Sequence, residues 1–392
     1  MSLPSQFLIG AATSSHQVEG NNIYNDWWEW EQSRPDIGNS GRATDHWNKY
    51  KEDFALAKQL GHTAHRFSIE WSRIEPKPGA FNRKAIEHYR EVLEELRRLN
   101  IKSFVTLHHF TNPVWLAKKG GWENGYAVDR FEKYVRYVAQ HLGHLVDFWV
   151  TINEPMVYAS QSYWRADWPP QKRTLRGMLR VIRNMAYGHM IAYRVLHSIT
   201  PDTPVGLAKH LIAYLPEHRR QLDDQIMAGL EDWWFNHRFF SLTGNTHDFI
   251  GVNYYFTTKL RVKLFPPRFM KVPWEGAVSD INWPIRPEGL THVLLHMKKY
   301  NLPIYITENG LADASDSKRS EFIRSHIKAV KKAMQQGVNV RGYLHWSLLD
   351  NFEWADGFKP RFGLIAVDYK TLERKIRPSA YVLKAFADSA NI

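Results

Sequence analysis

Short runs of β-branched and aromatic residues alternate with longer segments along the whole chain, and eight such runs can be counted. This alternation is typical of repeated strand–helix units, in which parallel strands are joined by crossover helices. Successive runs begin about 35 to 60 residues apart, which leaves room for one helix and a loop. The eight predicted strands are residues 7–12, 64–68, 102–107, 148–153, 205–208, 249–253, 304–308 and 340–346.

Two of the segments between these strands carry apolar residues at helical spacing. The first stripe is Ile86, Tyr89, Leu93, Leu96 and Leu99, and the second is Phe322, Ile323, Ile327, Val330 and Met334. Eight parallel strands with such helices close most simply into a barrel, because an open sheet of that size would expose two edges. No repeat, low-complexity tract or linker divides the chain. We therefore predict an α/β fold, a single (β/α)8 TIM barrel forming one catalytic domain over residues 1–392.

The formal net charge of +12 raises the question of a nucleic-acid or membrane partner. The basic residues are dispersed, however, and the short clusters at 173–183 and 328–332 have the spacing of solvated helix faces. The chain has no cysteine, so its fold needs neither disulfides nor thiolate metal sites. Its start lacks a secretory signal pattern, and no apolar run reaches membrane-spanning length. These features predict a cytoplasmic protein that binds neither nucleic acid nor membrane.

Two of the predicted strands lead into a glutamate. The fourth is followed by Glu154 and Pro155, and the seventh ends on Glu308, two residues before Gly310. Proline and glycine interrupt a strand, so each carboxylate is expected at the barrel rim. Reactive groups of such barrels lie at the carboxyl ends of the strands, and we therefore expect the two carboxylates to face each other across the mouth.

Two facing carboxylates are the requirement for glycoside hydrolysis. At a separation of about 5 to 5.5 Å one carboxylate attacks the anomeric carbon with retention, whereas a wider gap admits a water and inverts the product. Arg66, in the second strand, and Tyr255, after the sixth, are candidates for keeping Glu308 ionised. Glu154, close to an ionised Glu308, is then expected to hold its proton longer and to act as the acid.

Six motifs in order along residues 7–378 resemble glycoside hydrolase family 1, the β-glucosidase and β-galactosidase group. They are FLIGAA (7–12) with Gln17 and Glu19-Gly20, RFS (66–68), TINEP (151–155), NYY (253–255), ITENG (306–310) and WSLLDNFEW (346–354). The resemblance implies retaining double displacement without metal or cofactor. It also implies that Glu154 is the acid/base and Glu308 the nucleophile.

The same resemblance implies a set of residues that hold the non-reducing sugar. They are Gln17, His109, Asn153, Glu353 and Trp354, with Trp346 as the platform beneath the sugar. Asn153 would bond the 2-hydroxyl, a contact that strengthens in the transition state. A carboxylate at Glu353 favours a neutral sugar over a phosphosugar, because it accepts hydrogen bonds from a diol and repels phosphate. The expected ligands are small-molecule β-glycosides or oligosaccharides.

The sequence departs from the family at the sugar-binding edge near the third strand and, separately, on the leaving-group side. His108 stands where the family usually has Tyr, and Phe110 where it usually has Trp. The stretches 206–248 and 310–341, which normally frame the aglycone side, are short for the family. Aromatic faces stack on sugars, and the chain holds 16 tryptophans. The candidate platforms for the aglycone are Trp122, Trp164, Trp168, Trp274 and Trp283.

Two other functions use the same residues. A catalytically silent sugar-binding barrel would bind without turnover, since a fold does not guarantee chemistry. A transglycosidase would pass the covalent intermediate to a sugar or alcohol in place of water, which wide aromatic acceptor sites favour. The sequence predicts no oligomeric state.

Overall fold

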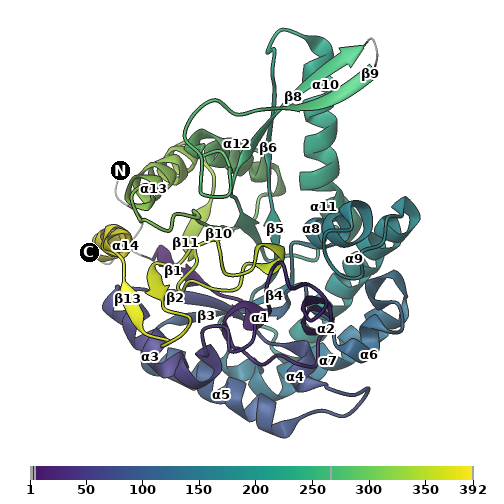
Figure 1. Cartoon of the computed structure of the whole chain (residues 1–392), viewed down its shortest axis with the longest axis vertical. Coiled ribbons are helices and arrows are strands. Elements are labelled where there is room, and N and C mark those ends of the chain that lie inside the picture. Colours follow the sequence, from purple (N-terminus) through teal and green to yellow (C-terminus); the bar gives the residue numbers. More distant parts are fainter. Residues whose placement is uncertain (1–2, 4–5, 265–266, 391–392) are drawn as a thin grey trace.

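The computed structural model describes Leu3, residues 6–264 and residues 267–390. The eight predicted strands form a closed parallel barrel in the order β1-β11-β10-β7-β5-β4-β3-β2 (Figure 1). These strands are β1 (Leu8–Ala12), β2 (Ala64–Ser68), β3 (Lys102–His108), β4 (Phe148–Asn153), β5 (Val205–His210), β7 (Phe249–Asn253), β10 (Ile304–Asn309) and β11 (Val340–Trp346). The predicted (β/α)8 barrel is thus confirmed.

The predicted strand bounds differ from the observed ones by two residues at most. The largest difference is at β5, which continues through Lys209 and His210 because both residues pair with β7. The two side chains are polar but buried, so hydrophobicity alone ended the predicted strand too early. This extension carries His210 to the rim of the barrel.

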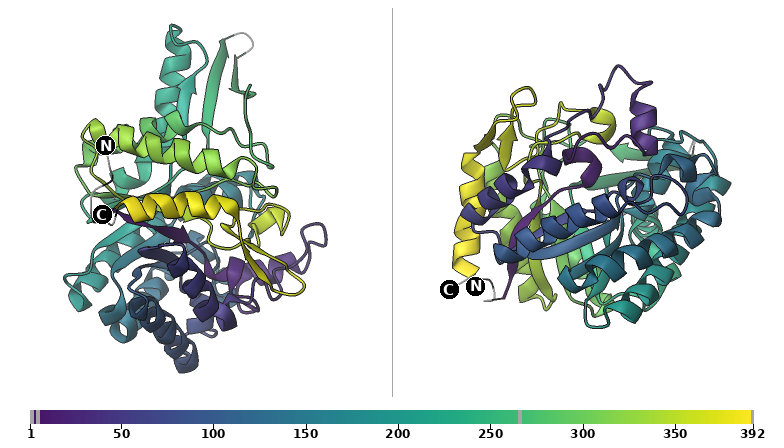
Figure 2. Two further views of the ribbon diagram at one scale, coloured as in Figure 1. Left: turned by 90° about the vertical axis from the view of Figure 1, so that its left-hand side faces the viewer. Right: turned by 90° about the horizontal axis from the view of Figure 1, so that it is seen from below.

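Helices surround the barrel. The first predicted apolar stripe lies on α5 (Arg83–Arg98), with Leu99 directly after its last residue, and the second lies on α13 (Arg319–Gln335). Figure 2 shows α13 and α14 side by side on the outside of the barrel. The α-helices are α1 (Ser15–Val18), α2 (Asp26–Glu31), α3 (His46–Gln59), α4 (Trp71–Ile74), α5 (Arg83–Arg98), α6 (Val114–Ala117), α7 (Tyr126–Leu142), α8 (Pro155–Ser160), α9 (Leu175–Ile199), α10 (Leu222–Glu231), α11 (Arg238–Thr243), α12 (Pro287–Met297), α13 (Arg319–Gln335) and α14 (Pro378–Ala390). Single turns of 3-10 helix are η1 (Gly121–Glu123), η2 (Gly143–Leu145), η5 (Lys298–Tyr300) and η6 (Trp354–Asp356), and π-helices are η3 (Gln161–Arg165) and η4 (Asp232–His237).

A cluster of inward-facing strand residues fills the interior of the barrel. Its buried members are Ala64, Phe104, Val150, Ala208, Phe249, Tyr305 and Leu344. The rings of Phe104 and Phe148 stack with centroids 4.2 Å apart near the start of β4. This apolar cluster closes the barrel near the start of its strands. The mouth at the carboxyl ends of the strands is left for polar groups.

A small sheet and one helix extend beyond the barrel (Figure 1). The sheet has the order β6-β8-β9, with strands β6 (Ala213–Pro216), β8 (Thr257–Leu264) and β9 (Pro267–Val272), and α10 contacts β6 and β8. A separate hairpin pairs β12 (Ile365–Val367) with β13 (Arg374–Ile376). Among the described helices, none combines the length and the apolar character needed to cross a bilayer.

Candidate active site

Glu154 lies at the junction between β4 and α8. Its φ of 45° places it in the left-handed region, and Pro155 begins the helix directly after it. Its backbone N–H donates to the Ala208 carbonyl oxygen at 2.8 Å, which fixes the junction to β5. Non-glycine residues rarely adopt this conformation, and they keep it only where the surrounding structure holds them in place. The turn thereby aims the carboxylate into the barrel mouth.

The Glu154 carboxylate is buried and has two polar neighbours. Asn253 Nδ2 donates to Glu154 Oε1 at 2.7 Å. His210 Nδ1 lies 3.5 Å from the same oxygen. Asn253 is itself oriented by Thr307, whose hydroxyl donates to Asn253 Oδ1 at 2.6 Å. Residues from β5, β7 and β10 therefore position this carboxylate.

Glu308 lies within β10 and receives both partners that the sequence suggested. Arg66 Nη1 donates to Glu308 Oε1, and the Tyr255 hydroxyl donates to Oε2 at 2.6 Å. Arg66 is fully buried and its Nε also donates to Thr106 Oγ1 at 3.0 Å, so the guanidinium has little freedom to move. Donors on both carboxylate oxygens fix the orientation of Glu308.

A chain of hydrogen bonds joins the surroundings of the two carboxylates. Arg66 Nη2 donates to Asn153 Oδ1 at 2.7 Å, and Asn253 Nδ2 approaches the same oxygen at 3.1 Å. Asn153 Nδ2 lies 3.2 Å from His109 Nε2. Such a satisfied buried network holds its members in one geometry. It joins Arg66, which was predicted to keep Glu308 ionised, to Asn153, which was predicted to bond the 2-hydroxyl of the sugar, and Tyr255 meets Arg66 through Glu308.

The pKa values of the two carboxyls are shifted in opposite directions. Burial raises the pKa of Glu308 to about 7; the charge of Arg66 opposes this rise, the charge of Glu154 adds to it, and the Tyr255 hydroxyl opposes it. Burial also acts to raise the pKa of Glu154, but His210 and Asn253 outweigh it and hold that pKa below its usual value. These directions are opposite to the sequence prediction that Glu154 holds its proton longer. The causes are the burial of Glu308 and the contacts of Glu154 with His210 and Asn253, which that argument did not consider.

The predicted sugar-binding residues line one cavity of about 1030 Å³ that opens onto both carboxylates. Its lining includes Gln17, His109, Asn153, Tyr255, Trp346, Glu353 and Trp354. The His109 ring lies nearly parallel to Trp346 and Trp354, with centroid distances of 6.2 and 6.0 Å. Flat aromatic faces beside convergent polar groups are the composition expected of a sugar pocket. Arg66 does not line the cavity and acts from behind Glu308.

Glu353 and Gln17 form a polar corner of this cavity. Gln17 Nε2 donates to Asn351 Oδ1 at 2.8 Å and approaches Glu353 Oε2 at 3.3 Å. Burial raises the pKa of Glu353 to about 8, against a hydrogen bond from Trp346. The group is therefore largely protonated at neutral pH before a sugar binds. The prediction that the negative charge of Glu353 repels a phosphosugar therefore holds only at a pH above this pKa.

The segment that runs from Trp346, the last residue of β11, to Trp354 is anchored by Asp350. Asp350 is fully buried, and Arg377 donates to its two oxygens at 2.8 and 2.9 Å. Close packing of the same segment explains one glycine of the ITENG motif, because a Cβ at Gly310 would lie 1.7 Å from the Trp346 carbonyl oxygen.

Three of the five tryptophans proposed as aglycone platforms line the cavity: Trp164, Trp168 and Trp283. The other two do not, and the prediction is wrong for them. Trp122 is fully buried and its Nε1 donates to His108 Nε2 at 3.0 Å, so it belongs to the core between barrel and helices. Trp274 packs against Arg286, whose guanidinium lies 4.3 Å from the ring centroid.

Sequence reasoning missed several residues that line the cavity, notably His210, Trp234 and Phe235. His210 would have been found by extending the fifth strand two residues, because the residues that end barrel strands were the ones searched. Trp234 and Phe235 lie on the π-helix η4, whose apolar pattern fits neither the helical nor the strand period. No sequence signal marked them as pocket residues.

Comparisons with known proteins cover the whole chain. Residues 1–245 and 240–392 match the family model described as Glycosyl hydrolase family 1. The chain is 32% identical to a β-galactosidase of Pyrococcus woesei, over 95% of this chain and 94% of that protein. It is 31% identical to β-glucosidase A of Thermotoga maritima, over 96% of each. A solved β-glycosidase from Pyrococcus horikoshii superimposes with a TM-score of 0.94 at 40% identity, covering 99% of this chain and 95% of that one. The likeness therefore extends over the entire barrel rather than over isolated motifs.

Proposed function

We propose, from the premise that this chain belongs to glycosyl hydrolase family 1, that it releases β-linked glucose or galactose from non-reducing ends with retention of configuration. The chain is a glycoside hydrolase, as its family membership establishes. The two substrate sugars follow from relatives named β-glucosidase and β-galactosidase. The residue roles and the stereochemistry are inferred from the site.

The observation that carries the proposal is the different environment of the two carboxylates. Glu308 receives a guanidinium on one oxygen and a hydroxyl on the other. These donors favour its anionic form and fix its direction, as a nucleophile requires. Glu154 has one amide donor and one imidazole neighbour. We assign Glu308 as the nucleophile and Glu154 as the acid/base.

The reaction then proceeds in two steps. In the first, a Glu308 oxygen bonds to the anomeric carbon while Glu154 gives its proton to the glycosidic oxygen, so that the aglycone leaves as an alcohol. In the second, Glu154 takes a proton from a water molecule, whose oxygen displaces Glu308 from the same carbon. Two displacements at one carbon restore the β configuration.

The pKa shifts of Glu308 and Glu154 in the free enzyme bear on the first step of the reaction. This step needs one proton on the pair of carboxyls, located on Glu154. The directions in the free enzyme place that proton on Glu308. We propose that the productive state differs from the resting one only in the position of this single proton, with Arg66 and Tyr255 stabilising the ionised Glu308 once the proton has moved.

The polar corner of the cavity supports action at chain ends. Gln17 is buried there and Glu353 is partly buried, so they can bond the outer hydroxyls of one terminal sugar. The aromatic wall formed by Trp164, Trp168 and Trp283 remains for the leaving group. A terminal sugar held at the polar corner would be removed one unit at a time.

The proposal is tested by covalent trapping with a 2-deoxy-2-fluoro-β-glucoside that carries a good leaving group. The electron-withdrawing fluorine slows both steps, and the good leaving group keeps formation of the intermediate faster than its hydrolysis. We expect inactivation with a fluoroglucosyl group on the peptide containing Glu308, and no labelling of the Glu308→Gln variant. Labelling at Glu154 would reverse the two roles. Binding of β-glycosides without turnover or labelling would instead support the silent sugar-binding barrel.

The same assay mixture distinguishes hydrolysis from transfer. Product analysis of p-nitrophenyl β-D-glucoside turnover with added acceptor sugar should give mainly free glucose. Disaccharide as the dominant product at low acceptor concentration would favour the transglycosidase.

A further inference from the structure

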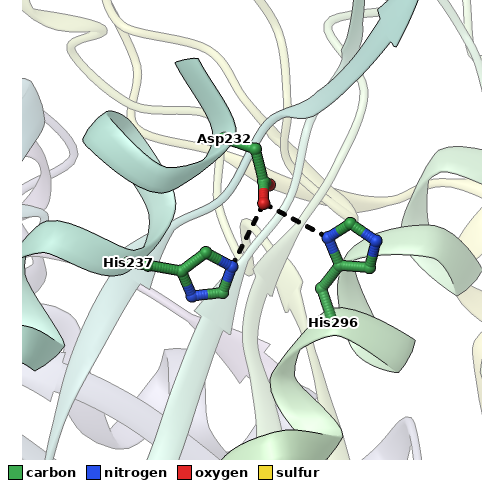
Figure 3. Close-up of side chains that lie close together, drawn as sticks. All are labelled: Asp232, His237 and His296. Atoms are coloured by element: carbon green, nitrogen blue, oxygen red, sulfur yellow. Dashed lines mark hydrogen bonds and ion pairs between the residues drawn. The ribbon is translucent and has the colours of Figure 1, made fainter. Parts of the chain in front are cut away.

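Three side chains of metal-ligand type meet outside the catalytic pocket (Figure 3). Asp232 and His237 are the first and last residues of the π-helix η4, and His296 comes from α12. None of the three lines the catalytic cavity. Single π-helical turns are frequent at functional sites, and this one turns both of its terminal side chains toward α12.

The spacing of the three groups fits a small divalent ion. Asp232 Oδ2 lies 3.2 Å from His237 Nε2 and 3.3 Å from His296 Nδ1. All three ligand atoms lie within 4.8 Å of one another. Zinc bonds to histidine nitrogen and carboxylate oxygen are about 2.0–2.2 Å, so neighbouring ligands on a tetrahedron lie roughly 3.3–3.5 Å apart. The two shorter separations match that edge without rearrangement.

The groups behind the ligands also have the arrangement of a metal site. His237 Nδ1 lies 2.8 Å from the Tyr300 hydroxyl, on the far side of the ring from Asp232. Asn236 Nδ2 donates to Asp232 Oδ1 at 2.7 Å, which leaves Oδ2 for the two imidazoles. Ligating histidines hold their other ring nitrogen in such hydrogen bonds, which fix the tautomer and the ring orientation.

The donor set selects the metal. Two imidazoles and one carboxylate suit zinc and other divalent transition ions better than calcium or magnesium, which prefer oxygen ligands. His296 is partly exposed, with 42% of its side chain accessible, so an ion and a completing water can reach the site. We infer that Asp232, His237 and His296 bind Zn²⁺, with water as the fourth ligand.

The proposed zinc site shares its π-helix, η4, with two residues of the catalytic cavity. Trp234 and Phe235, on the same π-helix, line the catalytic cavity. An ion bound to both η4 and α12 would join two distant segments of the chain, because Asp232 and His296 are 64 residues apart in sequence. Zinc would therefore fix the helix that carries Trp234 and Phe235 without contacting Glu154 or Glu308.

Without a metal, an N–H on each imidazole can donate to Asp232 Oδ2 and account for the same two distances. The experiment therefore has to distinguish a metal site from a hydrogen-bonded cluster. The full-length chain, freed of metal with a chelator, is titrated with ZnCl₂ by calorimetry. A parallel titration with CoCl₂ follows the visible absorption of low-coordinate cobalt. We expect saturable binding of about one ion per chain, the intense absorption of a tetrahedral site, and a rise in Tm with zinc.

The variants are His296→Gln and His237→Gln, and the control is His197→Gln. His197 forms a similar pair with Asp248, at 2.8 Å, but lies in no three-ligand group among the described residues. Zinc affinity should fall about tenfold or more in the first two variants and stay unchanged in the control. Because His296 is partly exposed, its variant should keep the fold. Absence of saturable binding to the wild-type chain, or equal binding by His296→Gln, would overturn the inference and leave the hydrogen-bonded cluster.

Discussion

Replacing Tyr255 with Phe removes one hydrogen bond from the proposed nucleophile and leaves the ring in place. The Tyr255 hydroxyl donates to Glu308 Oε2 at 2.6 Å, and both side chains are buried. Hydrogen bonds to charged groups contribute about 1.5–3 kcal/mol, because the ionised partner is stabilised more than the neutral one. The substitution therefore acts mainly on the ionised form of Glu308.

The sign and size of the effect follow from the pKa of Glu308. Burial raises this pKa to about 7, and the Tyr255 hydrogen bond is one of the contacts that lower it. Losing the bond raises the pKa further, by about 1–2 pH units at 1.36 kcal/mol per unit. At pH 7 the ionised fraction would fall from about a half to roughly a tenth or a hundredth. We expect kcat/KM at pH 7 to fall about 5- to 50-fold, with the basic limb of the profile, which follows the higher of the two pKa values, displaced to higher pH.

The assay is kcat/KM for p-nitrophenyl β-D-glucoside from pH 5 to 9, expressed as the ratio of variant to wild type. The ratio should rise toward one as the pH increases, since Glu308 then ionises in both enzymes. The matched control is Tyr254→Phe, because Tyr254 is also buried but its hydroxyl donates to the Arg286 carbonyl oxygen at 2.7 Å. The reasoning is refuted if Tyr255→Phe loses the same factor at every pH, or if Tyr254→Phe shifts the profile equally.

Three further changes test other parts of the account. Glu154→Ala should slow hydrolysis of alkyl β-glucosides far more than of p-nitrophenyl β-glucoside, because a good leaving group needs little protonation; equal losses in steady-state kinetics would contradict the acid role. His210→Phe keeps the aromatic ring beside Tyr255 but removes a group that lowers the pKa of Glu154, so the acid limb of kcat/KM, which follows the lower of the two pKa values, should move to higher pH, and an unmoved or lowered limb would count against it. Asp350→Asn takes the charge partner from buried Arg377 and should cost about 3–5 kcal/mol in denaturant unfolding, whereas a loss below about 1 kcal/mol would show that this pair does not anchor the segment.

The barrel was predictable because its strands are buried on both faces and therefore stand out as short apolar runs. The two glutamates were predictable for a related reason, since Pro155 and Gly310 mark where their strands end. The order of these features along the chain sufficed to place both carboxylates at one mouth. The small sheet of β6, β8 and β9 was not predicted, because it lies outside the repeating strand–helix pattern.

The errors in the site come from contacts between distant segments. His210 is one of the groups that lower the pKa of Glu154 below that of Glu308, and it reaches Glu154 only because β5 continues past its apolar residues. Trp122 looked like a sugar platform by its residue type, but its place against His108 in the core depends on helix packing. Trp234 and Phe235 enter the pocket because η4 is a π-helix, a geometry that no sequence period revealed.

The central claim is double displacement through Glu308, and the anomeric configuration of the first-formed sugar tests it most directly. Proton NMR during hydrolysis of an aryl β-glucoside resolves the two anomers before they equilibrate, with Glu308→Gln measured alongside. The account predicts that β-glucose forms first and that the variant releases none. Initial release of α-glucose would mean that water attacks the anomeric carbon directly across a wider gap, and would contradict the account.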